Sequence, residues 1–314
     1  MKLSKDSGVL LQGFEASTNL NRRRTADCDL TSSILSRYAV QMKAYGTNVV
    51  AAVIPGLGGQ TQHGIAVFDL VEQALPVVGP IDTTIIFVPP CQALDAALEA
   101  IAAGIRQIII TSDGMPPLDM VHLLRKAEAT ETLVLGPSSL GIIVPGKILL
   151  GIQESEFYTP GAVGIVSRSS TLTYEVALEL TRAGLGQSVS ISIGNDAILG
   201  SSFHQWLQIL DEDEATEAIV LIGEPGSGSE EAAAEYITEA IDKPVIAYIA
   251  GCHAPTDKYW GQTGTLATVV VERGAREHTA KSKIAALRAA NVAVAKRPSQ
   301  IPKLVRQALK SRMG

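Results

Sequence analysis

The sequence predicts an α/β protein that contains two doubly wound parallel sheets. Aliphatic residues dominate the 46% of the chain that is hydrophobic, while aromatic residues supply only 4% and 28 residues are Gly. That balance is typical of parallel layers, whose central strands are Val/Ile runs. Short apolar runs also alternate with segments of helical periodicity. Finally, 314 residues suit two domains that each bury a core of their own.

The expected strands are apolar runs, and helical patterns separate many of them. In the first half the runs lie at 49–54, 84–88, 107–111 and 132–135, with helical patterns at 94–103 and 118–129. In the second half they lie at 162–166, 188–193, 218–222 and 245–250, with helical patterns at 230–241 and 301–310. This alternation predicts parallel strands joined by crossover helices. Clustered Pro and Gly around Val144–Lys147 predict a domain boundary there, giving domains 1–146 and 147–314.

Charge and cysteine content exclude several classes of protein. The formal charge of −6 argues against a nucleic-acid-binding protein, which needs clustered positive charge. No stretch has the apolar length of a membrane span, and the N-terminus lacks the apolar core of a signal peptide. Cys28, Cys91 and Cys252 form neither a disulfide framework nor a metal-binding spacing. We therefore expect a cytoplasmic protein without a bound metal.

The segment 164–175 carries the clearest functional signal. Gly164-Ile165-Val166 favours a buried strand, and the polar turn Arg168-Ser169-Ser170 follows it and opens a helix. A strand-to-helix turn with free amides and hydroxyls is a ready anion site, because the amides and the helix dipole point at one spot. An ordinary capped helix is the alternative interpretation.

Many other segments, taken in order, resemble one known family. They are Leu11-Gln12-Gly13-Phe14, Ala44-Tyr45-Gly46-Thr47, Ile54-Pro55-Gly56-Leu57-Gly58-Gly59, Phe87-Val88-Pro89, Thr111-Ser112-Asp113-Gly114, Leu135-Gly136-Pro137-Ser138, Gly223-Glu224, Lys243-Pro244-Val245 and Tyr248-Ile249-Ala250-Gly251. With the turn at 168–170, they closely resemble the α subunit of succinyl-CoA synthetase (succinate–CoA ligase). The resemblance implies a Rossmann-like CoA-binding domain followed by a flavodoxin-like, doubly wound ligase domain.

The resemblance implies that CoA binds at the ends of the first strands. The residues it assigns there are Gln12, Gly13, Val53, Pro55, Phe87, Val88, Pro89, Ser112, Asp113 and Gly114. Two features depart from the family. No glycine follows Gly13 before Leu20, and Leu57 stands where the family typically has a phosphate-contacting lysine. Two interpretations of the Arg22–Arg24 run stay open: it binds the phosphates instead, or it is a solvated loop.

The resemblance also implies a phosphoryl relay. In this family an ATP-grasp partner subunit phosphorylates a histidine, which passes the phosphate to a carboxylic acid, and the CoA thiol then attacks the acyl phosphate. Ser169, Ser170 and Arg168 would bind the phosphate, and Glu224 matches the carboxylate that orients the histidine. Where the family has Gly-His-Ala-Gly, this chain has Gly261-Gln262-Thr263-Gly264.

Gln262 cannot carry a phosphoryl group, because an amide is neither basic nor usefully nucleophilic. His253 is the nearest substitute in the sequence, and His278 is a second. Alternatively, Gln262 would hydrogen-bond a phosphate held directly at Ser169 and Ser170, so that an acyl phosphate forms without a covalent relay.

Two functions therefore remain. The chain is either an alpha-type component of an ADP-forming succinate or acyl-CoA ligase with an altered phosphoryl route, or a catalytically inactive relative. The inactive relative would bind CoA or a metabolite as a regulatory or scaffold protein. For the ligase, the resemblance implies an ATP-grasp beta-type partner that supplies ATP and Mg²⁺, with self-association as the other mode of assembly.

Overall fold

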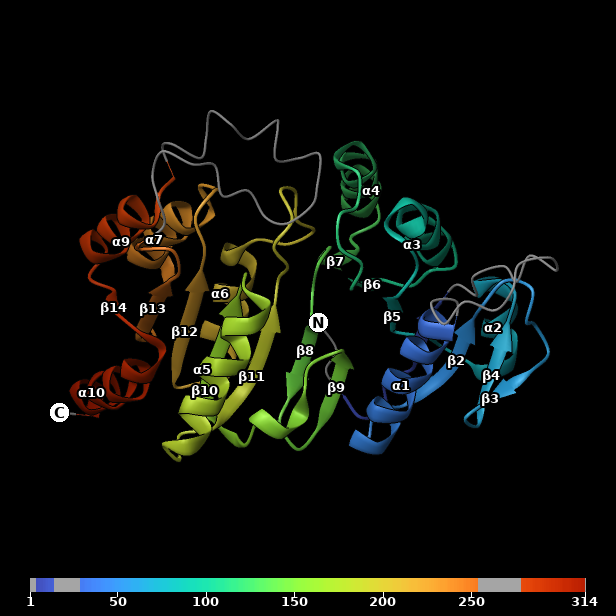
Figure 1. Ribbon diagram of the computed structural model, residues 1–314, viewed down its shortest axis with the longest axis horizontal. Helices are drawn as coiled ribbons and strands as arrows, with labels where there is room; N and C mark the ends of the chain where they lie inside the picture. The colour runs from blue at the N-terminus through green and yellow to red at the C-terminus, as the bar shows by residue number, and fades with distance from the viewer. Residues whose placement is uncertain (1–3, 14–28, 254–277, 314) are drawn as a thin grey trace. The chain divides into compact units, whose positions relative to one another are not determined.

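The computed structural model describes residues 4–13, 29–253 and 278–313, with side chains omitted for 29–34 and 312–313. The chain divides into two compact units. The first comprises Met1–Gly141 and Lys147–Gln153, and the second comprises Ile142–Gly146 and Glu154–Gly314. Figure 1 shows the helices and strands of both units.

The first sheet has seven strands in the order β3-β4-β2-β1-β5-β6-β7. Leaving out β3, which pairs antiparallel with β4, the other six strands have the Rossmann order 3-2-1-4-5-6. Their pairings are all parallel. The strands are β1 (Val9–Gln12), β2 (Val49–Val53), β3 (Thr61–Gln62), β4 (Ile65–Phe68), β5 (Thr83–Ile86), β6 (Gln107–Ile110) and β7 (Leu133–Leu135).

Helices join the strands of this sheet, as the alternating pattern predicts. They are α1 (Asp29–Tyr45), α2 (Val71–Val78), the short 3₁₀ helix η1 (Pro90–Gln92), α3 (Ala93–Ala102) and α4 (Pro117–Ala129). The central strands are aliphatic and fully buried, as shown by Ile85 and Ile109 with 0% and 1% exposure. Strands buried on both faces need continuous apolar runs, which explains the composition.

The second sheet also has seven strands, in the order β14-β13-β12-β10-β11-β8-β9. The parallel strands β10 to β14 have the flavodoxin order 2-1-3-4-5. The strands are β8 (Gly141–Val144), β9 (Ile148–Gly151), β10 (Pro160–Ser167), β11 (Gln187–Ser192), β12 (Ala218–Gly223), β13 (Val245–Ile249) and β14 (Ala293–Ala295).

Helices cover both faces of the second sheet (Figure 1). One face carries α5 (Ser170–Arg182) and α10 (Ile301–Met313), which contact each other. The other carries α6 (Phe203–Glu212), α7 (Ser229–Ala240) and α9 (Ala280–Ala289), which pack in that order. Two 3₁₀ helices complete the unit, η2 (Ser155–Phe157) and η4 (Pro298–Gln300). The chain leaves β10 toward β11 and later returns to β12 on the other side, so the strand order reverses at β10. In open α/β sheets, ligands bind at such a reversal, beyond the carboxyl ends of the strands.

The predicted α/β class with two doubly wound sheets is confirmed. The boundary predicted at residues 146/147 stays a prediction. None of the described helices is both long and apolar enough to cross a membrane.

Candidate functional site

The loops assigned to CoA follow four neighbouring parallel strands of the first unit, β2, β1, β5 and β6. Their carboxyl ends therefore meet at one edge of the sheet. Within this group, the Gln12 side chain is only 2% exposed. Its amide donates to the Ala96 carbonyl at 3.0 Å, and its oxygen accepts from Thr84 Oγ1 at 2.9 Å. Gln12 thus holds α3 against the sheet, and its assignment to CoA stays a prediction.

Gly13 brings α1 close to the end of β1. Its amide donates to the Val53 carbonyl at 2.9 Å. A Cβ atom at this position would overlap the Leu35 side chain of α1. The absence of a side chain therefore serves close packing of the helix on the strand, one of the roles of glycine in this fold.

The loop that begins at Pro55 is held by a carboxylate that no sequence motif singles out. Asp69, just after β4, accepts hydrogen bonds from the amides of Gly56 and Gly58 at 2.7 and 3.0 Å. A Cβ at Gly58 would overlap this carboxylate. The two amides are therefore occupied, and the carboxylate repels a phosphate at this loop. Leu57 adds no positive charge there.

Two more strand-end loops are tied together by their own side chains. The Ser112 hydroxyl donates to the Val88 carbonyl, and the Ser138 hydroxyl donates to the Asp113 carboxylate. Pro89 precedes the 3₁₀ helix η1, and Gly114 has a φ of 77°, which favours glycine.

An aromatic pair also lies at this edge. The ring of Phe87 stacks on that of Tyr38 from α1, with 6.1 Å between centroids and 14° between planes. Both residues are half-buried, so the pair offers an apolar surface beside the strand ends. Tyr38 was not selected from the sequence, because a tyrosine inside a helix gives no functional signal by itself.

In the second unit, the predicted turn lies at the strand-order reversal. Ser169 occupies the N-cap position of α5, but its side chain makes no capping hydrogen bond. Its hydroxyl instead hydrogen-bonds the Glu224 carboxylate, from the loop after β12. The first-turn amides of the helix, beginning with that of Ser170, therefore have no side-chain cap from Ser169. The structure thus brings together Ser169, Ser170 and Glu224, which are far apart in the sequence.

Burial and charge act in opposite directions on Glu224. Burial raises the pKa of its carboxyl, the Ser169 hydrogen bond and the Arg168 charge lower it, and the Glu230 carboxylate raises it; the net shift is upward. The Arg168 side chain is itself buried and turns toward the same loop, donating to the hydroxyls of Ser227 and Ser229.

A buried ion pair anchors this loop. The side chains of Lys283 and Glu230 pair directly, and each is 0% exposed. Lys283 also donates to the Ser227 carbonyl and, at 3.2 Å, to Glu231. The other oxygen of Glu230 accepts from the Glu224 amide at 3.0 Å. The pair therefore fixes both ends of the loop that carries Glu224 and the serines that contact Arg168.

The carboxylate of Glu231 adds to this charged cluster. Although burial opposes it, the pKa of Glu231 is lowered by the charge of Lys283 and by hydrogen bonds, including those from Lys283 and His278. His278 Nδ1 lies 3.2 Å from Glu231 Oε1. Its carbonyl also accepts from the Gly226 amide. His278 thus lies beside the loop after Glu224.

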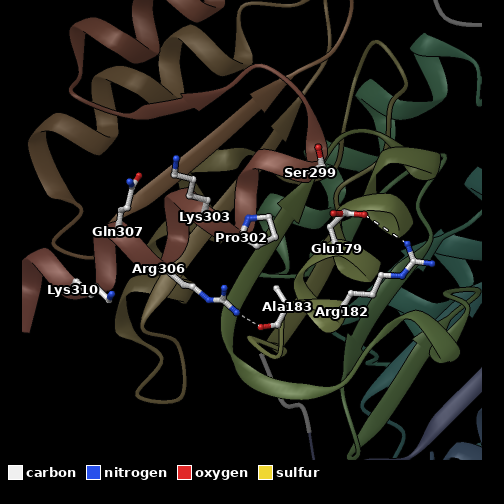
Figure 2. Close-up of a pocket in the computed structure, with 9 residues that line it drawn as sticks. All are labelled: Glu179, Arg182, Ala183, Ser299, Pro302, Lys303, Arg306, Gln307 and Lys310. Atoms are coloured by element: carbon white, nitrogen blue, oxygen red, sulfur yellow. Dashed lines mark hydrogen bonds and ion pairs between the residues drawn. The ribbon is translucent and has the colours of Figure 1, made fainter.

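A separate pocket lies at the opposite edge of the second sheet, where α5 ends (Figure 2). It is rich in cations, namely Arg182, Lys303, Arg306 and Lys310. Arg306 from α10 donates to the Ala183 carbonyl at the end of α5. Cations favour a helix C-terminus because its carbonyls carry partial negative charge, which accounts for Arg306 there.

Comparison with known proteins bears on both units. The family model described as a CoA binding domain matches residues 30–114, and the model described as CoA-ligase matches 166–293. The succinate–CoA ligase [ADP-forming] subunit alpha of Aquifex aeolicus is 39% identical over 312 residues, covering 98% of this chain and 94% of that protein. The malate–CoA ligase subunit alpha of Methylorubrum extorquens is 41% identical over 244 residues, covering 76% and 82%.

The chain belongs to the family of succinate–CoA ligase alpha subunits. The resemblance seen in the sequence is therefore confirmed. Among solved structures, ATP citrate lyase from Methanothrix soehngenii, in complex with citrate and coenzyme A, matches with a TM-score of 0.80 and 20% identity. The match covers 100% of this chain but 51% of that chain, so this alpha-type subunit spans about half of the larger protein, with which it shares the fold.

The residues at the centre of the predicted relay are only partly described. Gln262 and Arg22–Arg24 lie outside the described residues. His253 lies in an exposed turn after β13. His278 is held by Glu231, so of the two candidate histidines it is the one with a carboxylate partner in the described contacts.

We expect Lys283→Met to destabilise the protein by about 3–5 kcal/mol, because Glu230 would keep a buried charge without its partner. Urea unfolding followed by circular dichroism measures this. Lys281→Met, at an exposed position of the same helix, is the matched control and should cost little. A loss for Lys283→Met no larger than that of the control would contradict the anchoring role.

Glu224→Gln should stabilise the protein at neutral pH. Because the folded-state pKa of Glu224 lies above its ordinary value of 4.5, the unfolding free energy falls as pH rises from the ordinary value through the folded one. The variant lacks that loss. The urea midpoints should coincide near pH 4 and diverge at about pH 7.5, with the variant higher. Glu235→Gln, exposed on α7, is the control and should show no such divergence.

Proposed function

We propose that this chain is the alpha-type component of an ADP-forming CoA ligase, with CoA at the strand ends of the first unit and phosphate at the start of α5. An ATP-grasp beta-type subunit would supply ATP and Mg²⁺, and the enzyme would act in the cytoplasm. The observation that carries the proposal is the junction of Ser169 and Glu224 at the uncapped start of α5. Family membership over 98% of the chain supports it.

The α5 turn suits a phosphoryl group as it forms or transfers. Its first-turn amides and the helix dipole favour an oxyanion. Arg168, from the same turn, adds a positive charge that lowers the cost of a second anion beside Glu224. We propose that the Ser170 hydroxyl and first-turn amides bind phosphate, while Glu224 orients the group that delivers or receives it.

The route of the phosphoryl group must differ from a histidine relay at position 262. With Gln262, we propose that the γ-phosphoryl group of the ATP supplied by the partner is held at the α5 turn while a carboxylate oxygen of the acid attacks phosphorus. The bond to ADP breaks, ADP leaves, and an acyl phosphate forms. The CoA thiol then attacks the acyl carbon, and phosphate leaves. The alternative is a covalent relay through His278 or His253. Of these two histidines, the described contacts favour His278, because it has a carboxylate partner in Glu231.

The strand ends of the first unit suit the adenine and the apolar parts of CoA better than they suit the CoA phosphates. The Tyr38–Phe87 pair gives an aromatic surface. Asp69, in contrast, accepts the hydrogen bonds that the Gly56 and Gly58 amides of the 55–59 loop could otherwise donate to a phosphate. The CoA phosphates would therefore lie away from that loop. We propose that they lie near other residues assigned from the resemblance, namely Pro89, Ser112, Asp113 and Gly114, and near the Arg22–Arg24 run.

The second candidate function is a catalytically inactive CoA- or metabolite-binding protein that regulates or scaffolds other proteins, alone or by self-association. The observations that favour it are Gln262 in place of histidine and the carboxylate of Asp69 at a loop that would otherwise face phosphate. CoA binding is common to both functions, whereas phosphoryl transfer belongs only to the first.

CoA should bind the full chain with micromolar affinity in a calorimetric titration. Pro89→Glu, at a half-buried position on the strand-end edge where the phosphates are proposed to lie, should weaken binding at least about tenfold by repelling them. Val77→Glu is the matched control, because Val77 is 69% exposed near the end of α2 and away from that edge. Equal affinities for the two variants would place CoA elsewhere, and no binding to the native chain would remove the CoA site.

Gln262→His tests the phosphoryl end. With a succinate–CoA ligase beta subunit, ATP, CoA and succinate, the native chain should release ADP slowly by the direct route, and no release at all would favour the inactive function. The histidine variant should gain at least about tenfold, because imidazole is a good phosphoryl acceptor. Acid-labile phosphate on the variant measures the relay directly. Activity that is already high in the native chain and unchanged in the variant would support the direct route.

A further inference from the structure

A pocket of about 440 Å³ lies at the strand-order reversal of the second sheet, on the side of α6. It is bounded by the ends of three neighbouring strands: Arg168 after β10, the 193–202 segment after β11, and Ser227 and Ser229 after β12. Ser169, Ser170 and Glu224 are not among its lining residues. It therefore lies beside the site described above and shares with it Arg168 and the two serines that Arg168 contacts.

Arg168 is the charged residue of the lining, and it is deeply buried at 7% exposure. Its Nη1 donates to Ser227 and, at 3.0 Å, to Ser229, and its Nη2 donates to the Asp196 carbonyl at 3.2 Å. Its Nε is buried without a hydrogen-bond partner among the described residues. A guanidinium has five N–H donors, so part of this buried group's capacity remains unused within the chain.

The hydrogen-bond acceptors that hold the guanidinium in place are neutral, and the carboxylate on which its charge acts, that of Glu224, lies outside the pocket lining. The three acceptors just named are two hydroxyls and a carbonyl, and the lining contains no acidic residue. Burying a guanidinium is costly, and the cost falls further when an anion binds beside it. The pocket is therefore built to receive one negative charge at its Arg168 end.

Hydroxyl groups and apolar side chains make up the rest of the wall. Ser201 Oγ accepts from Trp206 Nε1 at 2.9 Å, so its own proton is available to donate. Ile193, Leu199 and Phe203 are apolar and lie in the same lining. The amide at the third position of α6 is already bound by Ser202 in a capping box, so the helix start is closed by the chain itself.

We propose that this pocket binds a short aliphatic monocarboxylate. The carboxylate pairs with Arg168 and accepts from neighbouring serine hydroxyls, and the hydrocarbon chain lies against Leu199 and Ile193. A phosphate would leave the apolar wall unfilled, and a second carboxylate would place a charge against it without a cationic partner. The proposal needs neither CoA nor ATP, so it stands apart from the ligase function.

Calorimetric titration of butyrate, succinate and inorganic phosphate into the full chain tests the proposal. Butyrate should bind in the millimolar range or better, and at least about tenfold more tightly than the other two probes. Ala197→Glu places a carboxylate at an exposed position of the lining and should weaken butyrate at least about tenfold. Ala285→Glu, exposed on α9 in the same unit, makes the same change elsewhere and should leave the affinity unaltered.

Three results would overturn the assignment: no butyrate binding, equal loss in both variants, or phosphate or succinate binding more tightly than butyrate. Circular dichroism and a CoA titration on the same samples show whether each variant is folded. A chain that binds CoA but not butyrate would keep the proposed function and lose this pocket. The converse result would keep the pocket and lose the CoA site.

Discussion

The arrangement of the second unit depends on one buried ion pair, that of Lys283 with Glu230. Two charges with no exposure to water are tolerated only when each is matched, since desolvating a lone ion costs several kcal/mol. That requirement holds α9 against α7 and restricts the loop between β12 and α7. The second oxygen of Glu230 holds the Glu224 amide, and Lys283 holds the Ser227 carbonyl. The loop is therefore held at its beginning and near its end by the same pair.

The fixed loop presents different groups in two directions. Glu224 meets Ser169 at the start of α5, while Ser227 and Ser229 meet Arg168 on the pocket side. Parallel order makes this possible, because β10 and β12 are neighbours although a helix, a strand and another helix separate them in the chain. Arg168 links the two directions electrostatically, since its charge lowers the pKa of Glu224. An anion bound in the pocket would reduce that effect, so occupancy of the pocket and protonation of Glu224 are coupled.

Periodicity and turn chemistry predicted the fold well, since short aliphatic runs such as 108–110, set between helical patterns, favour strands buried on both faces. The meeting of Ser169 with Glu224 followed from the family resemblance. Asp69 and Lys283 could not be predicted, because each acts on residues 11 to 56 positions away and an isolated Asp or Lys carries no mark of its partner. The hydrogen bond by which the Gln12 amide packs α3 was likewise not foreseen, because the family resemblance gave this residue a role without naming its partner within the chain. A sequence lists residue types, whereas a site depends on which side chains meet when crossover connections bring distant strands side by side.

The energetic character of the second unit argues that it still serves a ligand. Glu224 lies where burial raises its pKa, so its ionised form destabilises the folded chain. Arg168 is buried among neutral acceptors, with its Nε unpaired among the described residues. Neither arrangement improves packing, and an apolar residue at either position would avoid the desolvation that its charge now undergoes. Unfavourable placements of this kind are typical of functional sites, where a bound ligand offsets them. The groups that would bind an anion therefore lie together around β10 and β12, whichever route a phosphoryl group would take.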